Sequence, residues 1–248
     1  MIASTAATDL PRRRARRGEG DRLRDDILQA TIELLAETGD LDAVSIRAVA
    51  KRVGVTPPSI YLHFPDKVAL LDAACEPIFA DLARYFRVAC DGVASPLDRL
   101  CRMGGAYIQF ALDHREPFRI VFMSRCDDEV LMSMTAADLE AQTAFAPVIQ
   151  TVVEAQDAGL LGDCDPREVA MRLWVGAHGV ATLLISKPYF PWPPVEQLVD
   201  DFISMLALGL LVQTRVPGSA AEKLATMLTD LPPVDTAVRA ANMPKSAL

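Results

Sequence analysis

The sequence predicts an all-α protein, and three observations support that fold class. Apolar residues recur at helical spacing along nearly the whole chain. No segment of the sequence alternates apolar and polar residues as a half-buried strand does, and no internal repeat is present. Residues suited to helix N-caps precede successive apolar segments, namely Ser45, Asp66, Ser95 and Asp165. A chain of 248 residues that is 51% hydrophobic can bury a sizeable core.

The N-terminal part predicts an arm followed by two helices. Residues 1–20 lack apolar periodicity and carry five clustered arginines, so we expect a flexible basic arm formed by Arg12, Arg13, Arg14, Arg16 and Arg17. From residue 21 the apolar spacing predicts a helix that Gly39 ends with a left-handed cap. Ser45 caps a second helix, about two turns long, that ends at Gly54.

A third short helix begins with two prolines. Residues 54–56 form a tight turn, and Thr56 is expected to cap a helix whose first position is Pro57. Proline costs little there, because the N–H groups of a first helical turn have no partner within the helix. Ile60 and Phe64 point toward the core. The remaining side is offered to solvent or to a partner, and it carries Ser59, Tyr61 and His63.

The rest of the chain predicts a larger helical body and a loose tail. A fourth helix begins at Lys67, and we expect Pro77 to interrupt it and to act as a pivot between head and body. Further helices are expected at residues 96–113, 117–124, 135–158 (bent at Pro147), 166–186 and 194–214. After Pro217 we expect at most a short helix. The expected units are the arm 1–20, a head 21–66, a body 67–216 and a tail 217–248.

The net charge of −8 is unevenly distributed along the chain. Residues 1–67 carry 11 Lys and Arg against 10 Asp and Glu, whereas the rest of the chain carries 14 against 23. A comparatively basic head on an acidic body is suited to contact phosphates through the head alone.

The sequence disfavours several classes of protein. Its longest apolar runs fall short of the roughly 20 residues of a membrane span, and charged residues follow the arginine run where an export signal would be apolar, so we expect a cytoplasmic protein. The five cysteines form no C-x-x-C pair and are interpreted as reduced thiols. The sequence has no nucleophile elbow, phosphate loop or zinc-protease motif, so we expect no catalytic site. The acidic run 127–129 beside Cys126 has no nearby histidine, so we expect no metal and no cofactor.

Two short helices joined by a glycine turn are typical of a helix-turn-helix, whose second helix enters the major groove of DNA. The segments "SIRAVAKRVGVTPPSIYLHFPDKVALL" and "ILQATIELLAETG" resemble the DNA-binding domain of the tetracycline-repressor (TetR) family of bacterial transcription regulators over residues 23–71. The resemblance implies contacts with double-stranded operator DNA from Ser45, Arg47, Thr56, Pro57, Pro58, Ser59, Tyr61, His63 and Lys67. We also expect Lys51 to act through phosphates and the arm to reach the minor groove or the phosphates.

The body resembles one TetR subgroup that carries a Trp-x-x-x-His-Gly pattern, here Trp174, His178 and Gly179. The resemblance implies an effector-binding and dimerisation domain in which helices 166–186 and 194–214 pair with their copies. Candidates for the wall of an effector cavity are Tyr107, Phe110, Phe118, Phe122, Trp174 and His178. The resemblance implies a homodimer interface that includes Gly176, Ala177, Val180 and Leu184, and the small residues among them permit close approach of two helices.

Together these patterns predict a ligand-responsive repressor that binds a palindromic operator as a homodimer and is released by a small, apolar effector. The two recognition helices should then lie about 34–36 Å apart. One alternative is a helical protein that binds hydrophobic ligands without reading a specific operator, although the charge asymmetry disfavours it. A transcriptional activator is a second alternative.

Overall fold

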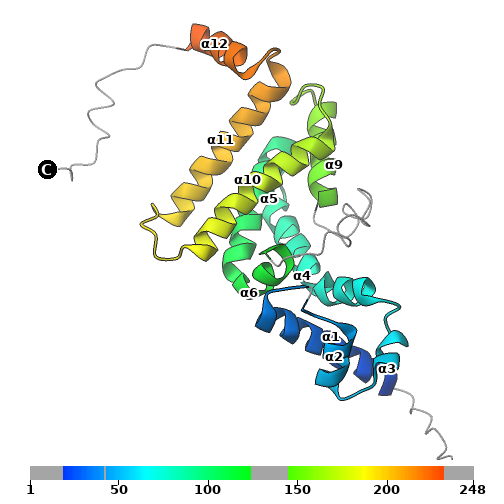
Figure 1. Cartoon of the computed structure of the whole chain (residues 1–248). Helices are drawn as coiled ribbons and strands as arrows, with labels where there is room; N and C mark the ends of the chain where they lie inside the picture. Colours follow the sequence, from blue (N-terminus) through cyan, green and yellow to red (C-terminus); the bar gives the residue numbers. More distant parts are fainter. Residues whose placement is uncertain (1–18, 42, 124–144, 232–248) are drawn as a thin grey trace, which may run out of the picture.

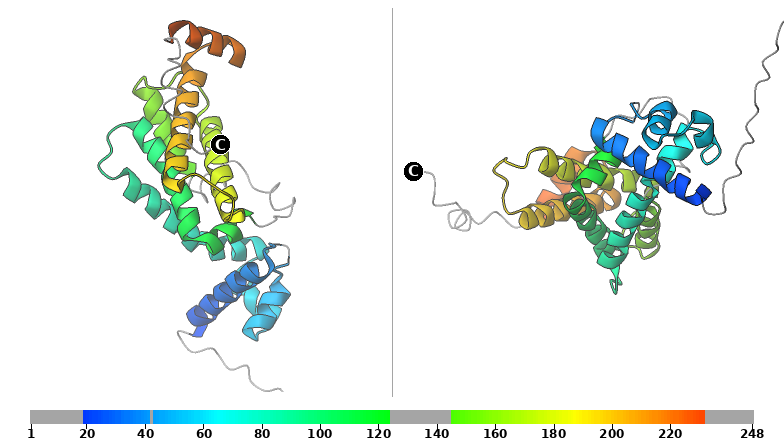
Figure 2. Two further views of the ribbon diagram at one scale, coloured as in Figure 1. Left: turned by 90° about the vertical axis from the view of Figure 1, so that its left-hand side faces the viewer. Right: turned by 90° about the horizontal axis from the view of Figure 1, so that it is seen from below.

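The computed structural model describes residues 19–41, 43–123 and 145–231, and there the chain forms the all-α fold that the sequence predicts (Figure 1). No strand is formed within these ranges. The helices are α1 (Glu19–Thr38), α2 (Ile46–Val53), α3 (Pro57–Tyr61), α4 (Lys67–Cys90), α5 (Pro96–Asp113), α6 (Arg115–Phe118), η1 (Arg119–Met123), α9 (Phe145–Asp157), α10 (Pro166–Ser186), α11 (Val195–Arg215) and α12 (Ala220–Asp230). Helices α1 to α3 form a head at one end of the molecule, and α4 leads from this head into a longer body (Figures 1 and 2).

A small apolar core holds the head together. Ile27 of α1, Val49 of α2 and Ile60 of α3 are each 0% exposed, and α1 packs against both α2 and α4. Burial of an aliphatic side chain of this size stabilises the fold by about 1.5–3 kcal/mol. This packing orders α3, which is too short to be stable as an isolated helix.

Helix α5 lies at the centre of the body. It packs against α4, α9, α10 and α11 and buries Tyr107, Phe110 and Ala111. An ion pair between Arg99 of α5 and Glu154 of α9 adds a polar link. Helices α10 and α11 contact each other and run side by side along one flank of the body (Figure 1).

Several predicted helix ends are confirmed where a cap side chain fixes them. Asp66 accepts a hydrogen bond from the Ala69 N–H at 2.8 Å, and α4 begins at Lys67. Ser95 and Asp165 likewise cap α5 and α10, which span residues 96–113 and 166–186 as predicted. Helix α1 begins at Glu19, within the segment expected to be an arm; residues 1–18 lie outside the described part of the chain.

The prediction that Pro77 interrupts the fourth helix is wrong. Helix α4 runs continuously from Lys67 to Cys90. A proline inside a helix removes one backbone hydrogen bond, but the turns on both sides are held by buried side chains. Leu70 and Leu71 belong to the core of the head, and Leu82 and Phe86 belong to the core of the body.

Two further segments differ from their predicted form. The helix expected at 117–124 begins earlier, as α6, and continues into the π-helical turn η1. After Pro217, Ser219 and Glu222 form a reciprocal capping box that starts the 11-residue helix α12, longer than the short helix expected. Of the helix expected at 135–158, the structure describes α9, with Pro147 in its first described turn; residues 135–144 are outside the described ranges.

Helix α10 is long and apolar enough to cross a membrane by length and composition alone. It packs against α5, α9 and α11 and buries Val169, Ala170 and Ala181. Helices covered on several sides by protein have the same apolar composition. These neighbours cover part of α10, since 28% of its apolar window is buried.

Candidate nucleic-acid interface and effector cavity

The turn between α2 and α3 sets the angle between these two short helices. The Ser45 hydroxyl accepts a hydrogen bond from the Ala48 N–H at 3.1 Å and starts α2. At the other end Gly54 has a φ of 80°, and the N–H groups of Gly54 and Val55 both donate to the Ala50 carbonyl at 2.9 Å. Glycine adopts this left-handed conformation without strain. Gly54 therefore allows the chain to pass directly from α2 into α3.

Helix α3 buries one side and exposes the other. Ile60 is 0% exposed, whereas Tyr61 is 53% exposed. Pro58 is exposed as well, while Pro57, Ser59 and His63 are half-buried. Thr56 occupies the N-cap position, but its hydroxyl is hydrogen-bonded to the Ser59 hydroxyl (3.0 Å), so the predicted cap to the backbone does not form.

Positive side chains lie near this face, but only some of them are available to a partner. Arg47 and Lys51 are exposed on α2, whereas Lys67, at the start of α4, is half-buried and already interacts within the chain. Arg52 instead donates to both carboxylate oxygens of Glu37 on α1, at 3.0 and 2.6 Å. Its guanidinium thereby lowers the pKa of Glu37. Arg52 links α2 to α1 and does not belong to the available set.

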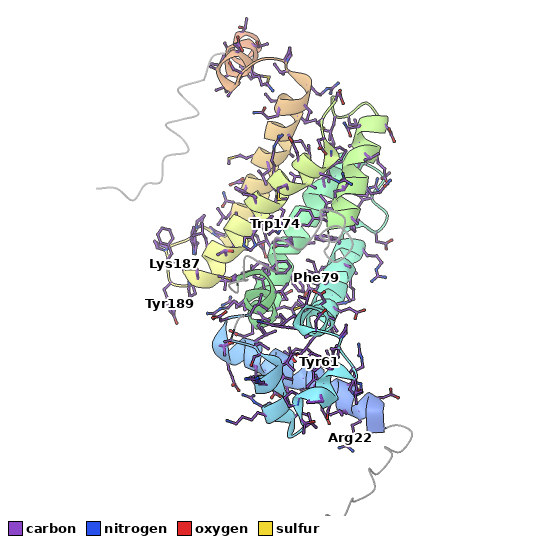
Figure 3. The ribbon with its side chains drawn as sticks, turned by 45° about the vertical axis from the view of Figure 1, so that its right-hand side comes forward. Arg22, Tyr61, Phe79, Trp174, Lys187 and Tyr189 are labelled. Atoms are coloured by element: carbon purple, nitrogen blue, oxygen red, sulfur yellow. The ribbon has the colours of Figure 1, made fainter. Side chains whose placement is uncertain are left out.

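Two arginines of α1 join the surface of the head although the sequence patterns do not single them out. Arg22 lies near the start of α1 (Figure 3), and the guanidinium of Arg24 stacks over the ring of Phe64 at 5.3 Å from its centroid. The sequence alone does not show which surface of the folded protein a helical arginine will belong to. The five arginines predicted for the arm lie outside the described residues.

The body contains an apolar cavity among α4, α5, α9, α10, α11 and the turn η1. The space that a water-sized molecule can occupy in it is about 70 Å³, smaller than the roughly 300–1,000 Å³ of typical small-molecule sites. Its described lining is aliphatic and aromatic, with Cys101 and Gly104, and carries no charged side chain. Figure 3 shows Trp174, one of the lining residues, among the helices of the body and well apart from Tyr61 on the head.

The structure places three of the six predicted cavity residues in the wall, namely Tyr107, Phe122 and Trp174. Phe110 (1% exposed) and Phe118 (0%) are packed in the core outside the wall. His178 lies behind the wall, where its ring stacks on Phe118 with 5.6 Å between centroids.

A chain of hydrogen bonds, here called the polar relay, reaches the cavity at Tyr107. Trp174 Nε1 donates to the Tyr107 hydroxyl at 3.1 Å. The same hydroxyl lies 3.0 Å from His178 Nδ1, and His178 Nε2 lies 3.3 Å from the Thr182 hydroxyl. Burial lowers the pKa of His178 and raises the pKa of Tyr107. Both side chains are therefore uncharged at neutral pH.

The structure places most of the predicted dimer residues on the inner side of α10. Ala177 (3% exposed) and Leu184 (5%) are buried in the body of their own chain. Gly176 packs against α11, where a Cβ would come within 2.9 Å of Leu206 Cδ1. These three residues face the interior of one chain rather than a partner, and Val180 is half-buried. Because α10 is apolar around most of its circumference, the sequence did not reveal which side faces outward.

Other residues of α10 and α11 leave apolar surface exposed. Val175 is 58% exposed on α10, and Met205 and Leu208 are 65% and 63% exposed on α11. Gly179 and Gly209 have open space where a side chain would stand. Exposed apolar side chains gathered on neighbouring helices are typical of an interaction surface.

The described residues hold no cluster of histidine, cysteine and carboxylate side chains suited to a metal ion. The acidic run 127–129 beside Cys126, where no metal is expected, lies outside the described residues. Cys75, Cys90, Cys101 and Cys164 are free thiols whose pKa burial raises. Thiols in such surroundings are poor nucleophiles.

Comparison with known proteins places this architecture in a family. Residues 27–74 match the model of bacterial regulatory proteins of the tetR family, and residues 100–206 match the tetracyclin repressor-like C-terminal domain. Together the two matches cover more than half of the chain. The chain belongs to the TetR family. Members of this family regulate transcription and are not enzymes.

Among curated relatives, this TetR-family chain is 42% identical to the tetracycline repressor class A from transposon 1721 of Escherichia coli over 55 residues, 22% of this chain and 25% of that protein. It thus spans about a quarter of the length of that relative. A structure from Rhodococcus sp. assigned to the TetR family is 25% identical, with a TM-score of 0.53 over 77% of this chain and 99% of that one. The regulator FadR of Bacillus subtilis, solved with stearoyl-CoA, shares the fold at 14% identity, with a TM-score of 0.57 over 75% and 98% of the two chains.

Proposed function

We propose that this TetR-family chain is a ligand-responsive transcriptional repressor that binds a palindromic operator as a homodimer and is released by a small, apolar effector. One observation carries the link between ligand and DNA. Ile120 of η1 is 5% exposed within the apolar core of the head, and Phe122, two residues further on, stands in the cavity wall. A ligand that displaces Phe122 would therefore change how the head is held, and an effector acts by favouring one such state.

The operator contacts are proposed for the exposed side of the helix-turn-helix. Pro58, Ser59 and Tyr61 would face bases or backbone in the major groove, with Ser45, Thr56, Pro57 and His63 beside them. Arg47, Lys51 and Lys67, together with the arm, would neutralise phosphates. The exposure of Arg47, Lys51 and Tyr61 supports this assignment.

The homodimer is proposed to form through α10 and α11. Exposed Val175, Met205 and Leu208 supply apolar surface, and open space at Gly179 and Gly209 permits close approach of a partner helix. A twofold axis at this interface would place the two α3 helices in successive major grooves, about 34–36 Å apart.

The remaining assignments follow from this reading. We assign residues 21–66 to the operator-binding head and 67–216 to the effector-binding body, and we place the chain in the Trp-x-x-x-His-Gly subgroup and in the cytoplasm. The described lining of the cavity carries no charged side chain, which supports an apolar effector. The FadR neighbour holds a ligand with a long apolar chain, which agrees with this choice.

The test is binding of the purified protein to the DNA just upstream of its own gene, at 50 and 200 mM salt, with an unrelated fragment of equal length as control. We expect selective binding whose affinity falls about 1000-fold between the two salt concentrations, because a dimer that neutralises about six phosphates releases as many counterions. A repressor lowers expression of a reporter behind this DNA, whereas an activator raises it. Equal, weak binding to both fragments would favour the alternative of a hydrophobic-ligand protein that reads no operator.

A further inference from the structure

Two members of the polar relay, Tyr107 and Trp174, belong to the wall of the apolar cavity. We propose that Tyr107, backed by Trp174 and His178, recognises an uncharged effector that carries a single oxygen acceptor, such as a ketone or ester carbonyl, on an otherwise apolar body. This inference rests on the proposed role of the cavity as an effector site. It specifies the chemical class of the ligand and the residue that hydrogen-bonds to it.

The hydrogen bonds of the relay leave Tyr107 able to serve a ligand. In one arrangement the Tyr107 hydroxyl accepts from Trp174 Nε1 and donates to His178 Nδ1, so that His178 carries its proton on Nε2 and donates to Thr182. The reverse direction satisfies the same atoms. Thr182 then donates to His178 Nε2, His178 Nδ1–H donates to Tyr107, and the hydroxyl hydrogen of Tyr107, a residue of the cavity wall, is released from the relay.

Reversal requires only the rotation of two hydroxyl groups and the other tautomer of a neutral imidazole. The Tyr107 hydroxyl can therefore donate to the carbonyl oxygen of a bound ligand. Without a ligand, it donates to His178 Nδ1 instead. Tyr107 is 4% exposed, and aromatic neighbours surround it: Phe118 and Phe122 make edge contacts with its ring at 5.6 and 5.8 Å between centroids. This packing fixes the position of the hydroxyl, so the recognition is directional.

A charged ligand group finds no partner of opposite charge among the described residues of the cavity wall. The described lining contains neither a cationic nor an anionic side chain, and an ion that leaves water without a partner shifts its pKa and becomes neutral instead. Among the described residues, the titratable groups of the cavity wall are Cys101 and Tyr107, whose pKa values burial raises, and His178 lies behind the wall with a pKa that burial lowers. None of them is charged at neutral pH. A carboxylic acid would therefore have to enter protonated.

The test uses the full chain without DNA and three ten-carbon ligands: 2-decanone, decanoate and decylamine. Each displaces the uncharged fluorescent dye N-phenyl-1-naphthylamine, and its Kd is measured at pH 6, 7 and 8. We expect 2-decanone to bind about 100-fold more tightly than decanoate at pH 7, since an alkanoic acid has a pKa slightly above that of Glu and only on the order of 1% of it is protonated there. Decanoate affinity should rise about tenfold for each unit of pH decrease, whereas 2-decanone affinity should stay constant.

A pair of variants separates the Tyr107 hydroxyl from general packing. Tyr107→Phe should weaken 2-decanone binding about 2- to 10-fold, the effect of one neutral hydrogen bond, and leave butylbenzene binding unchanged. Tyr85→Phe is the matched control, because the Tyr85 hydroxyl also bonds a histidine, His114 at 3.2 Å, but lies outside the cavity wall. It should change neither ligand.

The inference is overturned if decanoate or decylamine binds as tightly as 2-decanone at pH 7, if decanoate affinity is independent of pH, or if no ligand displaces the dye. It is also overturned if Tyr107→Phe leaves 2-decanone binding intact. Should that variant fail to fold, the pH series on the unmodified chain still decides. Because no measurement involves DNA, a failure of the operator proposal leaves these results unaffected and is seen separately.

Discussion

Replacement of Gly54 by alanine should destabilise the head although the added methyl group meets no neighbour. Gly54 has a φ of 80°, and a Cβ at this position has nothing within 4 Å. The effect therefore comes from backbone conformation alone. For an L-residue with a side chain, the left-handed region costs about 1–2 kcal/mol relative to the right-handed one.

We expect Gly54→Ala to lower the free energy of unfolding by about 1 kcal/mol, because alanine also restricts the unfolded chain and this offsets part of the strain. For a chain of this size the corresponding fall in Tm is about 2–4 °C. Thermal unfolding of the full chain, followed by circular dichroism at 222 nm, measures it. Operator affinity should fall as well, since the turn sets the angle between α2 and α3.

Gly105→Ala is the matched control. Gly105 lies inside α5 without a positive φ, and a Cβ there also has nothing within 4 Å. Alanine in a helix interior is more favourable than glycine by about 0.8–1 kcal/mol, so this variant should raise Tm. Changes of the same sign and size in the two variants would refute the argument that the backbone conformation at Gly54 decides the outcome.

Three further predictions concern the proposed function. Arg47→Ala should weaken binding to every DNA sequence and reduce the slope of log affinity against log salt by about 1 for each phosphate that is no longer neutralised. Arg52→Ala should leave this slope unchanged, because Arg52 is engaged with Glu37. Equal slopes for the two variants would contradict the assignment of Arg47 to phosphate contact. Leu208→Asp should convert the dimer to a monomer in light scattering, because it buries a carboxylate at the proposed interface, and a dimer that survives would exclude this face. Pro77→Ala should alter effector-induced release more than effector-free operator affinity, and equal effects on both would contradict a pivot in α4.

The sequence was most informative where one side chain decides the local structure. Asp66, Ser95 and Asp165 each fix a helix start by a hydrogen bond to a backbone N–H, and those starts were predicted to the residue. The effect of Pro77 was overestimated, because tertiary packing on both sides of it lies beyond local sequence. Thr56 shows a similar limit: its hydroxyl pairs with Ser59, and the sequence cannot rank that bond against a backbone cap.

The candidate cavity was predicted less completely, and the reason is geometric. Phe118 and Phe122 are four residues apart and would share one face of a regular α-helix. The chain passes between them from α6 into the π-helical turn η1, which changes the rotation per residue. The two rings nevertheless remain in contact, with 4.9 Å between their centroids, yet Phe118 is buried in the core and Phe122 lines the cavity. The apolar pattern of the sequence does not show which ring of such a pair reaches a cavity wall.

The position of η1 has a consequence for how proteins of this design can diversify. A substitution at Phe122 that reshapes the cavity for a new ligand acts on the same turn that inserts Ile120 into the head. A substitution here that changes ligand preference would also change the operator affinity of the ligand-free protein. Changes of specificity that spare basal regulation should therefore accumulate on the far walls of the cavity, on α9 and α11, whose described residues take no part in the core of the head.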